Sequence, residues 1–124
     1  MKRLLIYAGL LLFMVFGLIS CYKDVILPSV ASTKPAQYVS FSGDLQPIFT
    51  TDCALSGCHV KGSQVPYLTP DVSYQQLLGG FVNTVKPQQS QLYIMINGNM
   101  QVHIPDATDR QKIYDWIRNG APNN

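Results

Sequence analysis

A pair of cysteines followed at once by a histidine limits what this chain can build. Cys53 and Cys58 are separated by four residues, and His59 comes directly after the second cysteine. The folded part of the chain is small, so an apolar core made only from its own side chains is expected to be marginal. Small domains gain stability from a disulfide, a structural metal or a buried cofactor, and this Cys-Cys-His stretch offers the chemistry for each.

Three interpretations of the stretch follow from its residue types. A disulfide between Cys53 and Cys58 closes a small loop and contributes little stability. A zinc site would use both cysteines with His59 and His103, although two adjacent residues occupy two corners of one tetrahedron with difficulty. Covalent haem attachment uses two thiols for the porphyrin vinyl groups and the adjacent histidine for the iron; the usual signature has two residues between the cysteines, whereas this chain has four.

The N-terminus predicts export and lipid attachment. Two basic residues precede an uncharged apolar run, residues 4–19, which is the layout of a secretory signal peptide and is short for a membrane-spanning helix. The run leads into Leu-Ile-Ser-Cys at 18–21, which resembles the lipobox of bacterial lipoproteins. We therefore predict a signal peptide at 1–20 and a lipidated Cys21 that tethers an exported protein to a bacterial membrane, on the periplasmic or outer-surface side. A short membrane anchor with an incidental cysteine is the alternative.

Charge gives no sign of a nucleic-acid partner. The chain has nine basic and seven acidic residues, and Lys2 and Arg3 belong to the predicted signal peptide. The side chains that remain after its removal are neutral overall, without a basic stripe. Asp52, which precedes Cys53, is expected to be a solvated loop residue.

Residues 21–40 are predicted to form a flexible tether and residues 41–124 the folded domain. The tether contains two prolines with scattered serines and threonines, and it lacks helical periodicity. Capping residues and apolar spacing in the domain predict four short helices joined by long loops, which is an all-α fold.

The predicted helix N-caps are Ser42, Ser73, Ser90 and Thr108, and the second and fourth of these begin capping-box patterns. Glycine-containing stops follow at 79–80, 97–98 and 120. The positions expected to face the core are Leu45, Ile48, Phe49, Leu92, Tyr93, Met95, Ile96, Ile113, Tyr114, Trp116 and Ile117.

Residues 41–124 resemble a class of small c-type cytochrome domains found in bacterial lipoproteins. The similar segments are Phe-Ser-Gly-Asp-Leu-Gln-Pro-Ile-Phe at 41–49, Ser-Gln-Leu-Tyr at 90–93 and Trp-Ile-Arg-Asn-Gly-Ala at 116–121, in this order around the Cys-Cys-His stretch. The resemblance implies a small helical fold around one covalent haem c, with the first and last helices of the domain packed together.

The resemblance also implies the roles of individual residues. Cys53 and Cys58 would attach the haem, and His59 would be the proximal iron ligand. Met/His ligation is the cytochrome c pattern, and Met100 lies where the family usually provides its methionine. Many relatives carry Met-Pro at the position of Ile-Pro here, and His103 comes just before that pair. Met100 is therefore the predicted distal ligand, with His103 as the alternative and Met95 or an open site after it.

The implied function is electron transfer between redox protein partners, by a carrier rather than an enzyme. Two other classes of function stay open. One is a haem enzyme or gas sensor with an open iron site, and the other is a non-haem binding lipoprotein stapled by a disulfide.

Overall fold

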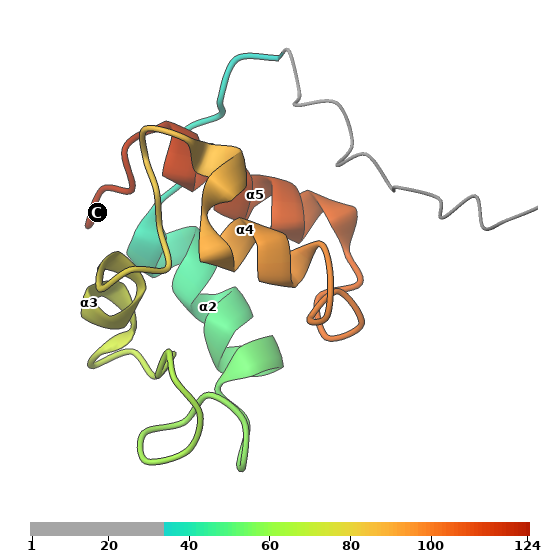
Figure 1. The fold of residues 1–124 in the computed structure, drawn as a ribbon. Coiled ribbons are helices and arrows are strands. Elements are labelled where there is room, and N and C mark those ends of the chain that lie inside the picture. The colour runs from blue at the N-terminus through green and yellow to red at the C-terminus, as the bar shows by residue number, and fades with distance from the viewer. Residues whose placement is uncertain (1–33) are drawn as a thin grey trace, which may run out of the picture. The chain divides into compact units, whose positions relative to one another are not determined.

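The computed structural model describes residues 34–124, which fold into helices joined by long loops (Figure 1). This part of the chain contains no strand, which confirms the predicted all-α class. None of its helices is long and apolar enough to cross a membrane. The predicted signal peptide and Cys21 lie outside the described residues. The elements are η1 (Phe41–Leu45), α2 (Gln46–Ile48), η2 (Phe49–Cys53), α3 (Ser73–Leu78), η3 (Pro87–Gln89), α4 (Gln91–Ile96) and α5 (Ala107–Arg118).

The elements η1, α2 and η2 follow one another without a break and form one helical run, residues 41–53. The two outer elements have the wider π-helical hydrogen bonding, and α2 between them is α-helical. The register changes next to Pro47, which has no N–H to donate and lies in the first turn of α2. The run ends at Cys53, so its last turn delivers the first cysteine of the Cys-Cys-His stretch.

Two of the predicted N-caps are displaced by two residues. Ser40, rather than Ser42, caps the helical run, because its hydroxyl accepts a hydrogen bond from the Gly43 N–H at 3.1 Å. At α5, the carboxylate of Asp106 accepts from the Thr108 N–H at 2.7 Å, so the predicted cap at Thr108 is wrong. In both cases a second residue with capping chemistry stands two positions earlier, and the turn geometry selects that residue.

The other two predicted caps use their hydroxyls elsewhere. Ser73 is the first residue of α3 instead of its cap, and its buried hydroxyl donates to the side-chain oxygen of Gln46 in the helical run. Ser90 does occupy the N-cap position of α4, but its hydroxyl accepts from the Asn83 N–H at 2.8 Å. Ser73 therefore connects α3 to the helical run, and Ser90 fixes the loop at Asn83 to the start of α4.

The helical run and α4 both contact α5, and this packing forms the core (Figure 1). The ring centroid of Phe41 lies 5.3 Å from that of Trp116, and the rings of Tyr93 and Tyr114 lie 4.7 Å apart. The Trp116 indole N–H donates to the Pro122 carbonyl at 2.9 Å. Apart from Met95, which is half-buried, every position expected in the core is buried, as predicted.

Residues 34–40, the described part of the predicted tether, lie against the end of α5. The Arg118 guanidinium donates to the Lys34 carbonyl at 2.8 Å, and the Asn119 side chain donates to the Gln37 carbonyl. The side chain of Val39 is buried in the core. This segment is therefore held on the domain by both polar and apolar contacts.

Two isoleucines in neighbouring helices test this description of the core. Ile113 on α5 is fully buried, whereas Ile94 on α4 is 51% exposed. We expect Ile113→Ala to lower the free energy of unfolding by about 2–5 kcal/mol, because it leaves a cavity in a packed core. The matched change Ile94→Ala should cost less than about 1 kcal/mol, since it removes little buried surface. Urea denaturation followed by circular dichroism measures both, and equal losses would contradict the assigned packing.

Candidate functional site

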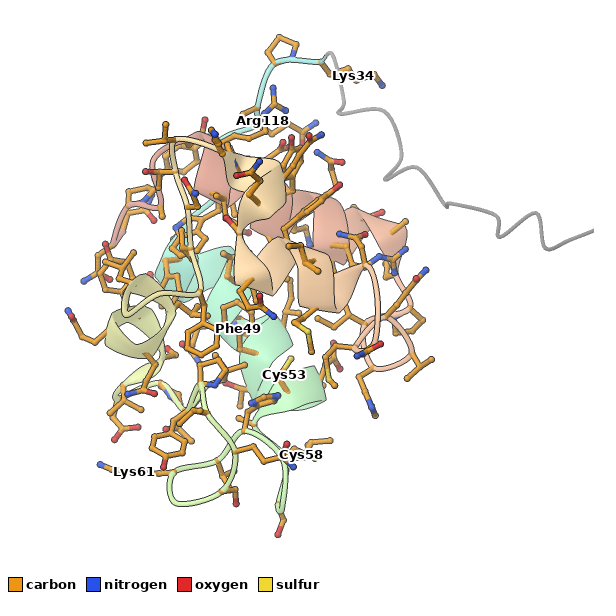
Figure 2. All side chains as sticks on the ribbon, viewed as in Figure 1. Lys34, Phe49, Cys53, Cys58, Lys61 and Arg118 are labelled. Carbon is orange, nitrogen blue, oxygen red and sulfur yellow. The ribbon has the colours of Figure 1, made fainter. Side chains whose placement is uncertain are left out.

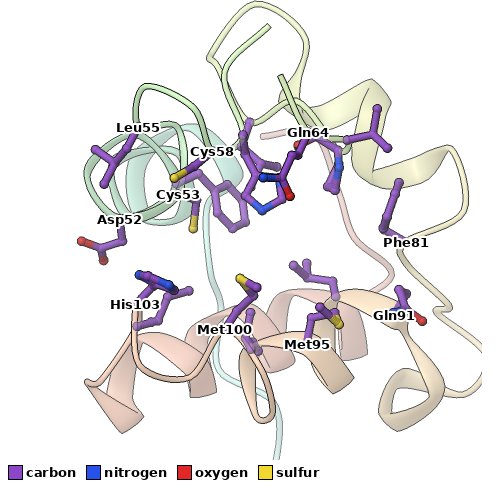
Figure 3. Close-up of a pocket in the computed structure, with 18 residues that line it drawn as sticks. Asp52, Cys53, Leu55, Cys58, Gln64, Phe81, Gln91, Met95, Met100 and His103 are labelled. Atoms are coloured by element: carbon purple, nitrogen blue, oxygen red, sulfur yellow. The ribbon is translucent and has the colours of Figure 1, made fainter. Parts of the chain in front are cut away.

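A pocket with a volume of about 450 Å³ lies between the Cys-Cys-His stretch on one side and α4 with the loop that follows it on the other (Figure 3). The volume is within the range of about 300–1,000 Å³ that is usual for small-molecule and cofactor sites. Much of the wall is apolar, and it includes Phe49, Leu68, Phe81, Leu92, Ile96 and Ile104. The pocket is therefore suited to a group with a large apolar surface.

The pocket brings together all the site residues predicted within the described part of the chain. Cys53, Cys58 and His59 line it from one side, and Met100 and His103 line it from the loop after α4. In Figure 3 the side chains of Cys53 and Met100 point into the space between the two walls. Met95, which the sequence assigned to the core, also lines the pocket.

The four residues between the cysteines are accommodated by a tight turn. The Cys58 N–H donates to the Leu55 carbonyl at 2.9 Å, and Gly57 takes a positive φ of 78°. This conformation is costly for residues that carry a Cβ, so glycine suits the position. The His59 N–H then donates to the Cys53 carbonyl at 3.1 Å. The longer spacer therefore folds back on itself and keeps the three residues beside one pocket. Figure 2 labels the two cysteines, one at the end of the helical run and the other in the loop that follows it.

The imidazole of His59 is oriented by the backbone of Pro66. Its Nδ1 lies 2.9 Å from the Pro66 carbonyl oxygen. A carbonyl can only accept a hydrogen bond, so Nδ1 carries the proton, and in the neutral ring Nε2 holds the free lone pair. Within residues 34–124, Nε2 has no hydrogen-bond partner. Every fully buried side-chain nitrogen and oxygen in this part of the chain does have a partner, so Nε2 is not fully buried and is accessible. This is the arrangement that a metal-ligating histidine usually has.

The loop after α4 supplies the opposite wall. The Met100 N–H donates to the Met95 carbonyl at 2.8 Å, and the His103 N–H donates to the Met100 carbonyl at 3.0 Å. These bonds fold the loop into consecutive turns at the end of the helix. Met100 is half-buried, whereas His103 is exposed, although both contribute to the pocket.

Burial changes the acidity of one cysteine. Removal from water raises the pKa of the Cys53 thiol from 9.0 to about 11, and electrostatic interactions with the neighbouring Asp52 and Cys58 add smaller increases. Asp52 was expected to be a solvated loop residue, but it lies in the last turn of the helical run, is half-buried and lines the pocket. Cys53 is therefore a protonated, neutral thiol at physiological pH.

The geometry gives little support to a disulfide or to a zinc site. Cys53 and Cys58 are both free thiols in the structure. Among the described residues, no three His, Cys, Asp or Glu side chains lie together in a way that would hold a metal ion. The two cysteines, His59 and His103 thus do not form the tetrahedral set that a structural zinc ion needs.

Comparison of the chain with protein-family models, with curated proteins and with solved structures found no match. The interpretation of the site therefore depends on its own residues and their contacts.

Three residues around the pocket had no functional assignment from the sequence. The Pro66 carbonyl could not have been named, because the contact depends on how the loop after His59 folds back. Gln46 entered the prediction only as part of the segment 41–49, and Gln76 only as the last residue of the capping-box pattern that begins at Ser73. Their side chains bond instead to the backbone of Leu68 and Tyr67, the two residues after Pro66. A polar residue with a long side chain on the inward side of a helix was the only available signal.

The pKa of Cys53 predicts how its thiol reacts. Since the thiolate is the nucleophile, only about one thousandth of Cys53 should be reactive at pH 8, and its alkylation rate should rise about tenfold per pH unit up to a pKa of about 11. Peptide mass spectrometry of the full chain, treated with iodoacetamide while its thiols are free, distinguishes Cys53 from the other cysteines.

The contribution of Asp52 is tested in the same assay. Asp52→Asn should raise the Cys53 rate at a fixed pH by less than about tenfold, because it removes a smaller cause than burial. Asp71→Asn, at a carboxylate outside the pocket, is the control and should have no effect. A Cys53 rate that does not change between pH 8 and pH 10 would contradict the assigned environment.

Proposed function

We propose that this chain is an exported, membrane-tethered c-type cytochrome with one haem, and that it carries electrons between redox proteins. One observation carries the proposal: an imidazole with its Nδ1 held by a backbone carbonyl lies with two thiols beside a mostly apolar pocket, and a methionine lines the facing wall. This donor set suits covalent haem better than a bare metal ion, because its nitrogen and sulfur atoms do not converge on one point.

Each residue has a task in this proposal. Cys53 and Cys58 would hold the group through thioether bonds, and His59 would coordinate the iron through Nε2. A covalent haem supplies reversible one-electron chemistry when bound. Addition of a thiol across a vinyl group would form the thioether and transfer the thiol hydrogen to the neighbouring vinyl carbon, so attachment would need no oxidant. The Pro66 carbonyl keeps the His59 ring in a single tautomer.

Met100 is the better candidate for the distal ligand. Its half-buried position places a soft thioether at the pocket wall with limited access to water, whereas His103 is exposed. Two backbone hydrogen bonds fix the Met100 turn to the end of α4 and to the residues that follow. A methionine held in this way favours a six-coordinate carrier over an enzyme or sensor with an open site.

The other parts of the proposal come from the sequence. The lipobox-like segment at 18–21 predicts a diacylated Cys21, which would hold the domain at a membrane without a spanning helix. The near-neutral charge of the remaining side chains favours a protein partner over nucleic acid.

Replacing the cysteines tests covalent attachment. A chain with both Cys53→Ser and Cys58→Ser should lose all haem that survives denaturing electrophoresis, because no thiol remains to form the bonds. Cys21→Ser is the matched control, since it removes the third cysteine and should leave haem attachment unchanged. Haem staining and intact mass measure the result. The proposal fails if the native protein has no covalent haem absorbance, or if the double variant retains haem normally.

Replacing Met100 tests the distal ligand. Met100→Ala should abolish the sulfur-to-iron charge-transfer band and lower the reduction potential by on the order of 100 mV, because a thioether ligand favours the reduced iron. Met95→Ala and His103→Ala are the controls and should retain the band. If the native protein lacks it, His103 becomes the better assignment, and a five-coordinate native spectrum would favour an enzyme or gas sensor.

A further inference from the structure

The segment that orients His59 is held in place by its own hydrogen bonds. Residues 66–68 carry the Pro66 carbonyl that accepts from the His59 ring. The Leu68 N–H donates to the His59 backbone carbonyl at 2.7 Å, so the segment returns alongside the residue that it orients. Pro66 is buried and has no N–H, so it cannot anchor itself through a donor. Its position depends on the residues that follow it.

Two glutamine side chains bind those residues. The side-chain oxygen of Gln76, on α3, accepts from the Tyr67 N–H at 3.3 Å. The side-chain NH₂ of Gln46, in the helical run, donates to the Leu68 carbonyl at 3.1 Å. The two bonds reach consecutive residues immediately after Pro66, and they come from two different helical elements.

The amide of Gln46 is fixed at both ends. A carbonyl cannot donate, so Nε2 must face Leu68, and the oxygen at the other end accepts from the Ser73 hydroxyl of α3. Nε2 also lies 3.2 Å from the Thr50 hydroxyl within the helical run. Gln46 therefore connects the helical run, α3 and the segment at 66–68, and its side chain has little freedom to rotate.

We propose that Gln46 and Gln76 are positioning residues that hold the Pro66 carbonyl at the Nδ1 atom of His59. This inference rests on the proposed function, in which the opposite ring nitrogen coordinates the haem iron. Neither glutamine lines the pocket, so each acts through the backbone. Together they determine which nitrogen of His59 is protonated and which faces the pocket.

The two positions respond differently to the same substitution. Gln76 uses only its oxygen toward the segment, so Gln76→Glu keeps the acceptor for the Tyr67 N–H. Gln46 uses its NH₂ group, so Gln46→Glu places a carboxylate oxygen against the Leu68 carbonyl, and the two acceptors repel. A role based on polarity or size alone would not separate the two variants.

The experiment is ¹⁵N NMR of the His59 ring in the full chain, solubilised in detergent and produced without haem, at pH 8. Wild type should show His59 mainly as the Nδ1–H tautomer. In Gln46→Glu and in Gln76→Leu, the ratio of Nδ1–H to Nε2–H should fall by on the order of fivefold, as for the loss of one net hydrogen bond. Gln76→Glu should stay near wild type, as should the control Gln75→Glu at an exposed neighbouring position.

Circular dichroism of each variant shows whether the fold is retained. A folded Gln46→Glu variant with the wild-type ratio overturns the inference, as does an equal effect of Gln46→Glu and Gln76→Glu. The proposed function fails separately, through absence of covalent haem in the native protein. Because the NMR measurement uses the haem-free chain, the tautomer ratio tests the role of the two glutamines whether or not haem is bound in the cell.

Discussion

The packing of Phe41 on Trp116 is the contact on which the rest of the domain depends. It joins the first turn of the helical run to α5, and Asn124 strengthens the junction by accepting from the Phe41 N–H at 2.7 Å. The start of the helical run is thereby fixed to α5 and to Asn124. Aromatic packing holds the start of the run in the core, and the other end of the run, at Cys53, lines the pocket.

The helical run therefore has two tasks along one axis. Its start and middle bury Phe41, Leu45 and Phe49 in the core, and its last turn presents Cys53 to the pocket. Gln46, between Leu45 and Phe49, bonds to the segment that orients the histidine. A change in core packing would thus move the site as well, because both are built on one rigid element.

The sequence predicted which residues are buried better than it predicted which residues bond to one another. Apolar spacing identified the buried faces, because periodic burial is a local property of a helix. The caps were harder: Ser40 and Ser42 have the same chemistry, and only the fold shows that the Ser42 hydroxyl donates to the Asn124 carbonyl at 2.8 Å. Ser73 was predicted to cap its own helix, yet its hydroxyl bonds to Gln46, which is far away in the sequence.

The candidate site shows the same division between residues and contacts. Cysteines, a histidine and a methionine are recognisable by type, but the carbonyl that selects the tautomer of His59 has no side-chain identity, since any residue would supply one. What makes Pro66 distinct is the folding of its loop and the two amides that hold the next residues. A histidine oriented only by a mobile loop would exchange tautomers and lose part of its ligand strength. Fixing the loop from two helices transfers the rigidity of the core to the ring, as the proposed coordination of haem iron by His59 would require.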